Sequence, residues 1–304
     1  MTLDTLPVGP PVPAPVLSIV LGTLNERPNL SELVDRIRSV PLPPWEAIVV
    51  DDGSTDGTRS FLQGLAQRDA RFRPIYHPSR RTTVPAQTQG VELARGRFVV
   101  VLDADLQHPP ELIPRLIAAL EAGARVAVAS RYLPGGSPGP RSPARGLLSR
   151  GADAIVRLGL RDARSLTDPV SGFFAFQRAL FRSPDRRVRG YKLLLQVLAM
   201  TDGGRVDEIP FRFEPRTAGA SKVVSDLGFL RVFLTEVLRA RQMGHAVRST
   251  SPDPRHGLLD TVAVPQGARP VRSETAPSPE ARSAPASSPE VDLRPFRPSA
   301  DPRR

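Results

Sequence analysis

Two carboxylates stand one residue apart at the end of an apolar run in the stretch VVVLDADLQHPPE, residues 99–111. In an extended strand, residues i and i+2 point to the same face, so Asp103 and Asp105 would lie side by side. Like charges at that distance repel each other unless a cation lies between them. Two interpretations follow. The carboxylates belong to a loop that faces water, or they bind a divalent cation that carries a phosphate-bearing substrate.

Patterns typical of strands and helices alternate through the first part of the chain. Apolar runs predict strands, and helical spacing of apolar residues predicts the helices between them. The expected strands are residues 16–21, 46–50, 73–77, 97–102 and 125–129, and the expected helices are 27–39, 58–67, 86–94 and 111–122. This alternation predicts an α/β fold with a mainly parallel sheet, in which ligands bind beyond the carboxyl ends of the strands. The polar residues that follow the strands would then meet at one edge, among them Asn25, Asp51, Asp52, Asp103 and Asp105.

The chain divides into three parts by composition. Residues 1–15 are rich in proline and are expected to form an extended N-terminus, and residues 16–248 would form one folded domain. In the second part of this domain we expect a loop at 134–145, a helix at 147–160, strands at 173–176 and 205–213, and an amphipathic helix at 223–241. Residues 249–304 are rich in proline, serine and arginine without lasting apolar periodicity, so we predict a disordered tail.

The composition is strongly basic, since 42 Lys and Arg residues against 31 Asp and Glu residues leave a net charge of +11. Such an excess attracts phosphates, nucleic acid or an anionic membrane surface. A basic nucleic-acid-binding protein is therefore one hypothesis. However, no recognised nucleic-acid motif is present and only 5% of the residues are aromatic, so we predict no nucleic-acid partner. The chain has no cysteine, which excludes disulfides and thiolate metal sites.

Eight short motifs follow one another between residues 17 and 222. They are LSIVLGTLNE (17–26), AIVVDDGSTDGT (47–58), VVLDADLQHPPE (100–111), SRYLPGG (130–136), LLSRGAD (147–153), TDPVSGFFAF (167–176), GYKLLLQVL (190–198) and EPRTAGASK (214–222). In this order they resemble the family 2 glycosyltransferases of GT-A fold, and within them the dolichol-phosphate or polyprenol-phosphate mannosyltransferases. The resemblance implies a mainly parallel mixed sheet flanked by helices. It also implies metal-dependent, inverting transfer of mannose from GDP-mannose to a polyprenyl or dolichyl phosphate.

The resemblance assigns the residues after the strands to the donor and to a metal ion. Mg²⁺ or Mn²⁺ would be held by Asp103, Asp105 and Gln107, since Mg²⁺ prefers a few oxygen ligands and such an ion would neutralise the departing diphosphate. Alternatively, Gln107 and His108 only cap the following helix, and for His108 we favour that alternative. The nucleotide-sugar would contact Thr23, Asn25, Glu26, Asp52, Asp103 and Ala104. Asp51 and Asp52 could instead be turn formers before the helix at residue 58.

A polyprenyl phosphate is an anion near neutral pH, so it needs cations to hold it more than a base to activate it. The resemblance implies that this phosphate is bound by Arg131, Ser149, Arg150, Arg216 and Lys222. Asp105 and Arg131 would be the catalytic residues. Lys192 and Lys222 are the only lysines among the 42 basic residues. Because lysine is a compact donor that arginine does not replace, we interpret both as geometrically required, with chance retention as the alternative.

The sequence departs from the family pattern in the nucleotide pocket, with GTLNE at 22–26 and RTTVPAQTQG at 81–90. UDP-glucose or another nucleotide-sugar therefore stays open as the donor. The apolar face of the helix at 223–241 could lie in a membrane interface or pack on the sheet as ordinary core. No stretch of about 20 apolar residues crosses a bilayer, and no signal peptide is expected. We therefore expect a cytoplasmic protein in peripheral contact with the inner face of the membrane, with room for a separate membrane partner.

Overall fold

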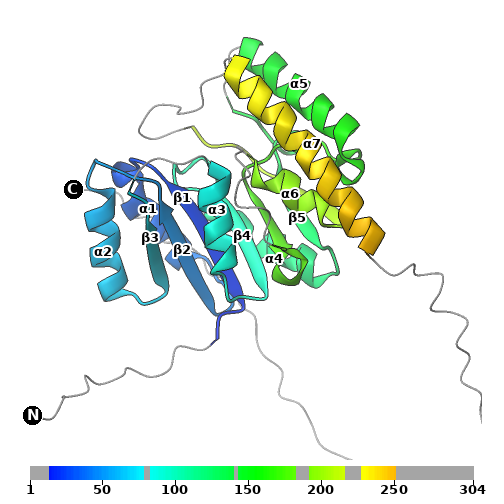
Figure 1. The fold of residues 1–304 in the computed structure, drawn as a ribbon. Helices are drawn as coiled ribbons and strands as arrows, with labels where there is room; N and C mark the ends of the chain where they lie inside the picture. Colours follow the sequence, from blue (N-terminus) through cyan, green and yellow to red (C-terminus); the bar gives the residue numbers. More distant parts are fainter. Residues whose placement is uncertain (1–13, 79–82, 140–142, 183–191, 216–226, 251–304) are drawn as a thin grey trace, which may run out of the picture. The chain divides into compact units, whose positions relative to one another are not determined.

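The computed structural model of the chain describes residues 14–78, 83–139, 143–182, 192–215 and 227–250. Seven strands form one mixed sheet in the order β3-β2-β1-β4-β6-β5-β7 (Figure 1). They are β1 (Leu17–Thr23), β2 (Trp45–Asp51), β3 (Phe72–Tyr76), β4 (Phe98–Asp103), β5 (Val126–Ser130), β6 (Phe174–Gln177) and β7 (Val206–Pro210). β1 pairs in parallel with β2 and β4, whereas β6 runs antiparallel to β4 and β5. The strands β1, β2 and β4 therefore end at the same edge of the sheet.

Helices follow most of the strands. They are α1 (Arg27–Ser39), α2 (Thr58–Arg68), α3 (Thr83–Glu92), α4 (Ile113–Glu121), α5 (Pro143–Gly159), α6 (Leu193–Ala199) and α7 (Leu227–Thr250), with short 3-10 helices η1 (Pro110–Leu112), η2 (Arg161–Ala163) and η3 (Arg178–Leu180). The α/β prediction is confirmed, and the parallel β1-α1-β2 and β3-α3-β4 units carry the loops that follow the strands.

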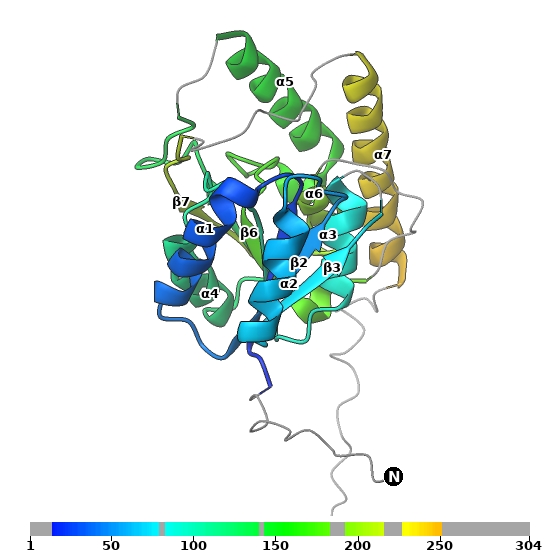
Figure 2. The same ribbon diagram turned by 90° about the vertical axis from the view of Figure 1, so that its left-hand side faces the viewer.

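Two apolar layers hold the helices on the sheet, and Figure 2 shows α1 and α4 on one side and α3 and α7 on the other. On the first side, Leu33 of α1 and Leu116 of α4 are fully buried in one cluster with Ile19 of β1. On the second side, Val91 of α3 and Phe233 of α7 belong to a separate cluster. α7 packs on α5 and α6, and a β-carbon at Gly159 would collide with Val237. Close packing thus fixes α5 against α7.

Three helices differ most from the sequence prediction. Helix α6 was not predicted because every one of its seven residues is buried, so no polar face reveals a helical period. Helix α5 begins at Pro143, inside the segment predicted as a loop. Helix α7 ends at Thr250, beyond the predicted helix end at residue 241 and beyond the predicted start of the tail. Some predictions lie outside the described residues: the first four residues of the predicted 223–241 helix, residues 1–13 of the N-terminus and residues 251–304 of the tail.

None of the helices within the described ranges combines the length and the hydrophobicity that crossing a bilayer requires.

Candidate active site

The edge where β1, β2 and β4 end gathers the residues that the sequence analysis singled out. Thr23 pairs with Asp51 across the sheet, and on its other side β1 pairs with β4 up to Asp103. The backbone N–H of Asp52 donates to the Thr23 carbonyl over 2.9 Å. The Thr23 hydroxyl is buried and has no hydrogen-bond partner among the described residues. A buried, unsatisfied hydroxyl is costly, so this edge offers a polar atom suited to a ligand.

The loop after β4 brings the three predicted metal ligands onto one turn. Leu106 adopts the left-handed conformation, with φ 64°, and turns the chain so that the backbone N–H of Gln107 donates to Asp105 Oδ1 over 3.2 Å. The Gln107 Nε2 donates to the carbonyl of Glu214 over 3.2 Å, so the amide oxygen is the atom that a metal would use. Asp105 is buried, whereas the side chain of Asp103 is 42% exposed.

The space beside Asp103 fits a hard cation with few protein ligands. A β-carbon at Gly172 would lie 3.2 Å from Asp103 Oδ2, so this glycine keeps that side of the carboxylate open. Across the part of the chain that the structure describes, no three side chains of the His, Cys, Asp and Glu types gather as a metal site. Two carboxylates and one amide make a sparse oxygen set, which suits Mg²⁺ or Mn²⁺ that keeps water and phosphate ligands.

His108 does not cap a helix, and that prediction was wrong. The 3-10 helix η1 has Pro109 at its N-cap and no side-chain cap. Instead, His108 Nδ1 accepts a hydrogen bond from the backbone N–H of Asp103 over 3.1 Å, and its ring packs against Phe173 and Phe213. Burial lowers the pKa of His108 to about 4, so the ring is neutral at physiological pH and Nδ1 is an acceptor. His108 therefore fixes the backbone of the Asp103 loop.

The loop after β2 separates the roles of two neighbouring carboxylates. Asp51 accepts a short hydrogen bond from the Ser54 hydroxyl and so forms the turn. Asp52 Oδ1 lies 3.2 Å from His77 Nδ1, and His77 Nε2 lies 2.7 Å from Gln89 Oε1. His77 thus ties the Asp52 carboxylate to helix α3. The carboxylate of Asp52 is held at the sheet edge rather than turned outward.

Asn25 and Glu26 join the first two strand loops to each other. Asn25 has φ 51°, its Oδ1 accepts from the N–H of Thr55, and its own N–H donates to Ser54 Oγ, each over 2.8 Å. Glu26 is buried, and its Oε2 accepts from Asn29 Nδ2 over 2.7 Å. These bonds hold both residues in the loop after β1, next to Thr23.

The residue after β5 is held by an acid that the sequence analysis assigned no role. Arg131 donates from Nε and Nη2 to the two carboxylate oxygens of Asp168, both over 2.6 Å. Asp168 is fully buried, and its N–H donates to Glu208 over 3.0 Å. Burial opposes the charge on Arg131, but the bonds to Asp168 outweigh it and raise the pKa of the guanidinium. A bidentate pair of this kind orients Arg131 firmly.

The remaining predicted acceptor ligands do not all lie near Arg131 in the described residues. Ser149 Oγ lies 3.1 Å from the hydroxyl of Tyr132, which places Ser149 beside the residue that follows Arg131. Arg150, the next residue of α5, is exposed. The predicted ligands Arg216 and Lys222 lie outside the described residues.

Lys192 joins the same region. Its charge interacts with those of Arg131, Asp103 and Asp168, and its backbone N–H donates to the buried carboxylate of Glu236 over 3.0 Å. Desolvation, together with the nearby Arg131, lowers the pKa of Lys192. The sequence offered two signals here. Asp168 stands in the TDPVSG motif and Lys192 in the GYK motif, yet neither motif says which partner its residue meets.

Comparison with known proteins identifies relatives along most of the chain. Residues 18–185 match the glycosyl transferase family 2. The chain is 38% identical over 208 residues to a dolichol-phosphate mannosyltransferase of Pyrococcus furiosus, covering 68% of this chain but only 59% of that protein. It is 34% identical to a polyprenol monophosphomannose synthase of Mycolicibacterium smegmatis, covering 67% of this chain and 80% of that protein.

Solved structures support the fold. One is glucosyl-3-phosphoglycerate synthase from Mycobacterium tuberculosis, crystallised with Mn²⁺, UDP-glucose and phosphoglyceric acid. It superimposes with a TM-score of 0.56 at 21% identity and covers 75% of this chain and 80% of that chain. At this identity the likeness concerns the arrangement of sheet and helices.

Proposed function

Because the chain belongs to glycosyl transferase family 2 and is a glycosyltransferase, we propose that it transfers mannose from GDP-mannose to a polyprenyl or dolichyl phosphate. The observation that carries this proposal is the single sheet edge that combines Asp52, the Asp103–Gln107 loop and Arg131. Arg131 belongs to it because β4 and β5 both run antiparallel to β6 and so end on the same side. The names of the relatives, dolichol-phosphate mannosyltransferase and polyprenol monophosphomannose synthase, support the choice of sugar and acceptor.

The donor would lie along the ends of β1, β2 and β4. The Thr23 hydroxyl would donate or accept a hydrogen bond with the nucleoside, and the Asp52 carboxylate would accept one from it. Asn25 and Glu26 shape the loops beside it. Asp103 and Ala104 face the sugar diphosphate from the end of β4. The residues Asp103, Asp105 and Gln107 would hold Mg²⁺ or Mn²⁺, which when bound neutralises negative charge on the departing diphosphate.

The reaction needs little proton transfer. A phosphate oxygen of the acceptor attacks the anomeric carbon of mannose, the bond from that carbon to the diphosphate breaks, and GDP leaves with inversion. The attacking oxygen is already ionised near neutral pH, so no general base is required. Asp105, buried and bonded to the Gln107 N–H, would hold the leaving-group side of the site in place during this step.

Cations on the acceptor side would receive the lipid phosphate. Arg131, oriented by Asp168, and Ser149 lie on one flank, and we add Lys192 on the ground of its charge interactions with Arg131 and Asp103. Desolvated cations bind a phosphate more strongly than exposed ones because water screens them less. Arg150, Arg216 and Lys222 remain proposed ligands of the same phosphate. The acceptor is a membrane lipid, so we place the protein at the cytoplasmic face of the membrane, in peripheral contact or beside a membrane partner.

A second candidate keeps the acceptor and changes the donor to UDP-glucose. The departures from the family pattern in the nucleotide pocket, at residues 22–26 and 81–90, favour it. A donor screen decides between the two. Purified protein is incubated with Mg²⁺ or Mn²⁺, a polyprenyl phosphate and each nucleotide-sugar in turn, and the lipid product is identified by mass spectrometry. We expect a mannosyl product from GDP-mannose alone. A glucosyl product would establish the second candidate, and no lipid product from any donor would contradict the proposed acceptor.

A further inference from the structure

Helix α7 has two faces of opposite character. Phe233, Val237 and Ala240 are buried against the body of the protein. On the other face stand Leu234, Leu238, Arg241 and His245, which follow each other at intervals of four, three and four residues and are all exposed. These intervals place them in one stripe along the helix. The stripe changes from apolar to basic as the helix proceeds.

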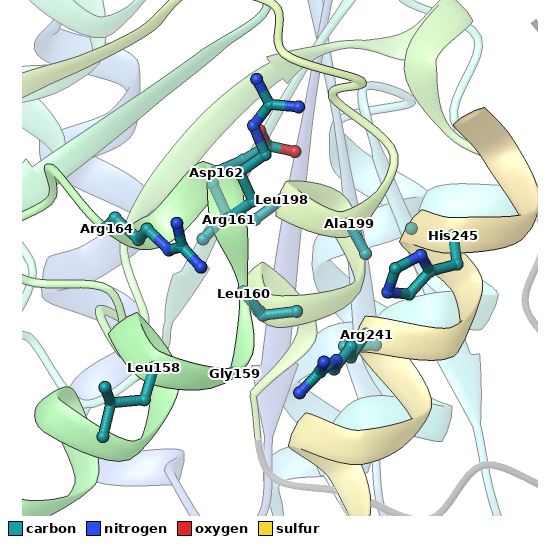
Figure 3. A pocket seen from close by; sticks show the side chains of 12 residues that line it. Leu158, Gly159, Leu160, Arg161, Asp162, Arg164, Leu198, Ala199, Arg241 and His245 are labelled. Carbon is teal, nitrogen blue, oxygen red and sulfur yellow. The ribbon is translucent and has the colours of Figure 1, made fainter.

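The basic end of this stripe borders a pocket of about 270 Å³ (Figure 3). The pocket lies between the end of α5, η2, the end of α6 and α7. Its floor includes the buried side chains of Leu160 and Leu198. Arg164, Arg241 and His245 stand around the same space in Figure 3. An apolar floor below a rim of cations fits a ligand that has an anionic head and an apolar body.

The rim is positive. It carries three arginines, Arg161, Arg164 and Arg241, against one acid, Asp162. None of the three guanidinium groups has an ion-pair partner within the described ranges, whereas Arg131 and Arg36 elsewhere are paired. The carboxyl ends of α5 and α6 lower this potential by about half a charge each, which leaves it positive. Arginine forks bind phosphates, as well as carboxylates, through two parallel hydrogen bonds.

Exposed leucines flank the pocket. Of the four large hydrophobic side chains that are exposed in the described part of the chain, Leu158 of α5 is 80% exposed and Leu238 of α7 is 60% exposed. Leu158 itself lines the pocket, and Leu238 stands one helical turn before Arg241. A free phosphate would cover the arginines but leave both leucines in water. A bilayer surface covers both groups at once, because lipid phosphates lie directly above acyl chains.

We propose that this pocket binds the headgroup phosphate of an anionic membrane lipid while Leu158 and Leu238 enter the apolar layer beside it. The site goes beyond the proposed transfer reaction, since its lining contains none of the residues assigned to donor, metal or acceptor. Ser149, on the acceptor side, stands nine residues before Leu158 on α5, roughly 14 Å along the helix. The lipid in the pocket is therefore an anchor, and it is separate from the acceptor lipid.

Vesicle co-sedimentation tests the pocket without any acceptor lipid. The full chain is mixed with vesicles of phosphatidylcholine alone or with about a quarter of phosphatidylglycerol. We expect binding to the anionic vesicles only. The double variant Arg164→Ala/Arg241→Ala should bind about 30-fold more weakly, since each arginine near an anionic surface contributes roughly fivefold. Arg115→Ala, at an exposed arginine of α4, is the matched control and should bind within about fivefold of the parent.

The leucines distinguish a bilayer from a soluble phosphate. Leu158→Ser/Leu238→Ser should weaken vesicle binding about tenfold or more, whereas Leu93→Ser, at a leucine that is 41% exposed elsewhere, should not. Near-native melting curves and mannosyl transfer in detergent check that each variant is folded. Equal losses from the pocket and control variants would overturn the proposal. It would also be overturned if inorganic phosphate or glycerol phosphate raised the melting temperature through Arg164 and Arg241 while anionic vesicles did not bind.

Discussion

Asp103 ends strand β4 and Arg131 follows strand β5 of the same sheet, but different contacts hold them in place. In the donor half, which we define as the loops after β1, β2 and β4, parallel strand register sets each functional residue beside the next. In the acceptor half, defined as Arg131, Ser149, Asp168 and Lys192, hydrogen bonds join groups that are 17 to 44 positions apart in sequence. Parallel strand register therefore places the donor half, whereas hydrogen bonds between distant groups, including the buried Arg131–Asp168 pair, place the acceptor half. Substitutions should expose this difference.

The largest effect is expected from Asp168→Asn in the acceptor half. This change leaves the guanidinium of Arg131 buried without its counter-charge, and breaking one partner of a buried pair costs about 3–5 kcal/mol. Urea unfolding followed by circular dichroism measures this loss. The matched control is Asp207→Asn, which removes the partner of the exposed Arg205 and should change stability little. If both variants lost a similar free energy of unfolding, the Arg131–Asp168 pair would stabilise the fold no more than an exposed ion pair.

In the donor half, Asp105→Ala should reduce kcat by about 10²–10³ while the unfolding free energy changes much less. Loss of this proposed metal ligand would remove stabilisation of the leaving diphosphate, but the strand register that places the loop persists. Steady-state transfer of radiolabelled mannose, beside urea unfolding, separates the two quantities. Turnover near that of the parent at saturating Mg²⁺ or Mn²⁺ would show that Asp105 is not a metal ligand.

A third difference concerns pH, through Asp153 of α5. Burial, with the charge of Asp168 second, raises the pKa of Asp153 to about 6. A carboxyl whose pKa is raised by folding binds its proton more tightly in the folded state. Its contribution to stability is thus present below about pH 4 and is lost as the pH rises to about 6. Asp153→Asn should remove this loss, so the variant gains roughly 1–3 kcal/mol over the parent between pH 4 and pH 7. Urea unfolding of both proteins across that pH range tests this expectation. If the difference in unfolding free energy between variant and parent did not change with pH, the raised pKa of Asp153 would be excluded.

The smallest effect is expected at Arg36, which lies beside the donor half. Arg36 of α1 donates to Glu111, which follows the Asp103–Gln107 loop, and to Glu214 after β7, with distances of 2.8–3.1 Å. The bonds to Glu111, and then those to Glu214, raise the pKa of Arg36, so the guanidinium stays charged. Gln107 and Glu214 also bond to each other through their backbones. Arg36 therefore positions the segment that holds Gln107.

Arg36→Met should raise the Mn²⁺ concentration for half-maximal activity about tenfold, because Gln107 loses its fixed neighbour. Arg38→Met is the control on the same helix, since Arg38 pairs with Asp69 and Asp35 and with neither segment of the site. An unchanged metal requirement in the Arg36 variant, or an equal change in both variants, would contradict this positioning role.

The sequence predicts the donor half well because its information is local. Asp52, Asp103 and Asp105 directly follow apolar runs, and a parallel sheet then brings them to one edge. The same reasoning places the helices from α1 to α4 within a few residues of their observed bounds. The correct predictions rest on a period of apolar residues, which locates a helix, or on a strand end, which locates a site residue.

The acceptor half follows from contacts that no local pattern encodes. The pairing of Arg131 with Asp168 and of the Lys192 backbone with Glu236 depends on how β5, α6 and α7 meet. His108 was misinterpreted for a similar reason, because its environment of Phe173 and Phe213 comes from distant segments. Helix α6 was missed because burial on all sides erases the amphipathic signal.

The division of the site between donor and acceptor is tested most directly by one paired measurement on Asp52→Asn and Lys192→Met. Titration calorimetry gives the Kd for GDP-mannose, and transfer kinetics in detergent give the KM for the polyprenyl phosphate. We predict that Asp52→Asn weakens donor binding ten- to a hundredfold with little change in acceptor KM, since a lost charge-assisted contact costs about 1.5–3 kcal/mol. Lys192→Met should do the reverse. If both variants impair both substrates alike, or if Lys192→Met weakens the nucleotide alone, the division is wrong.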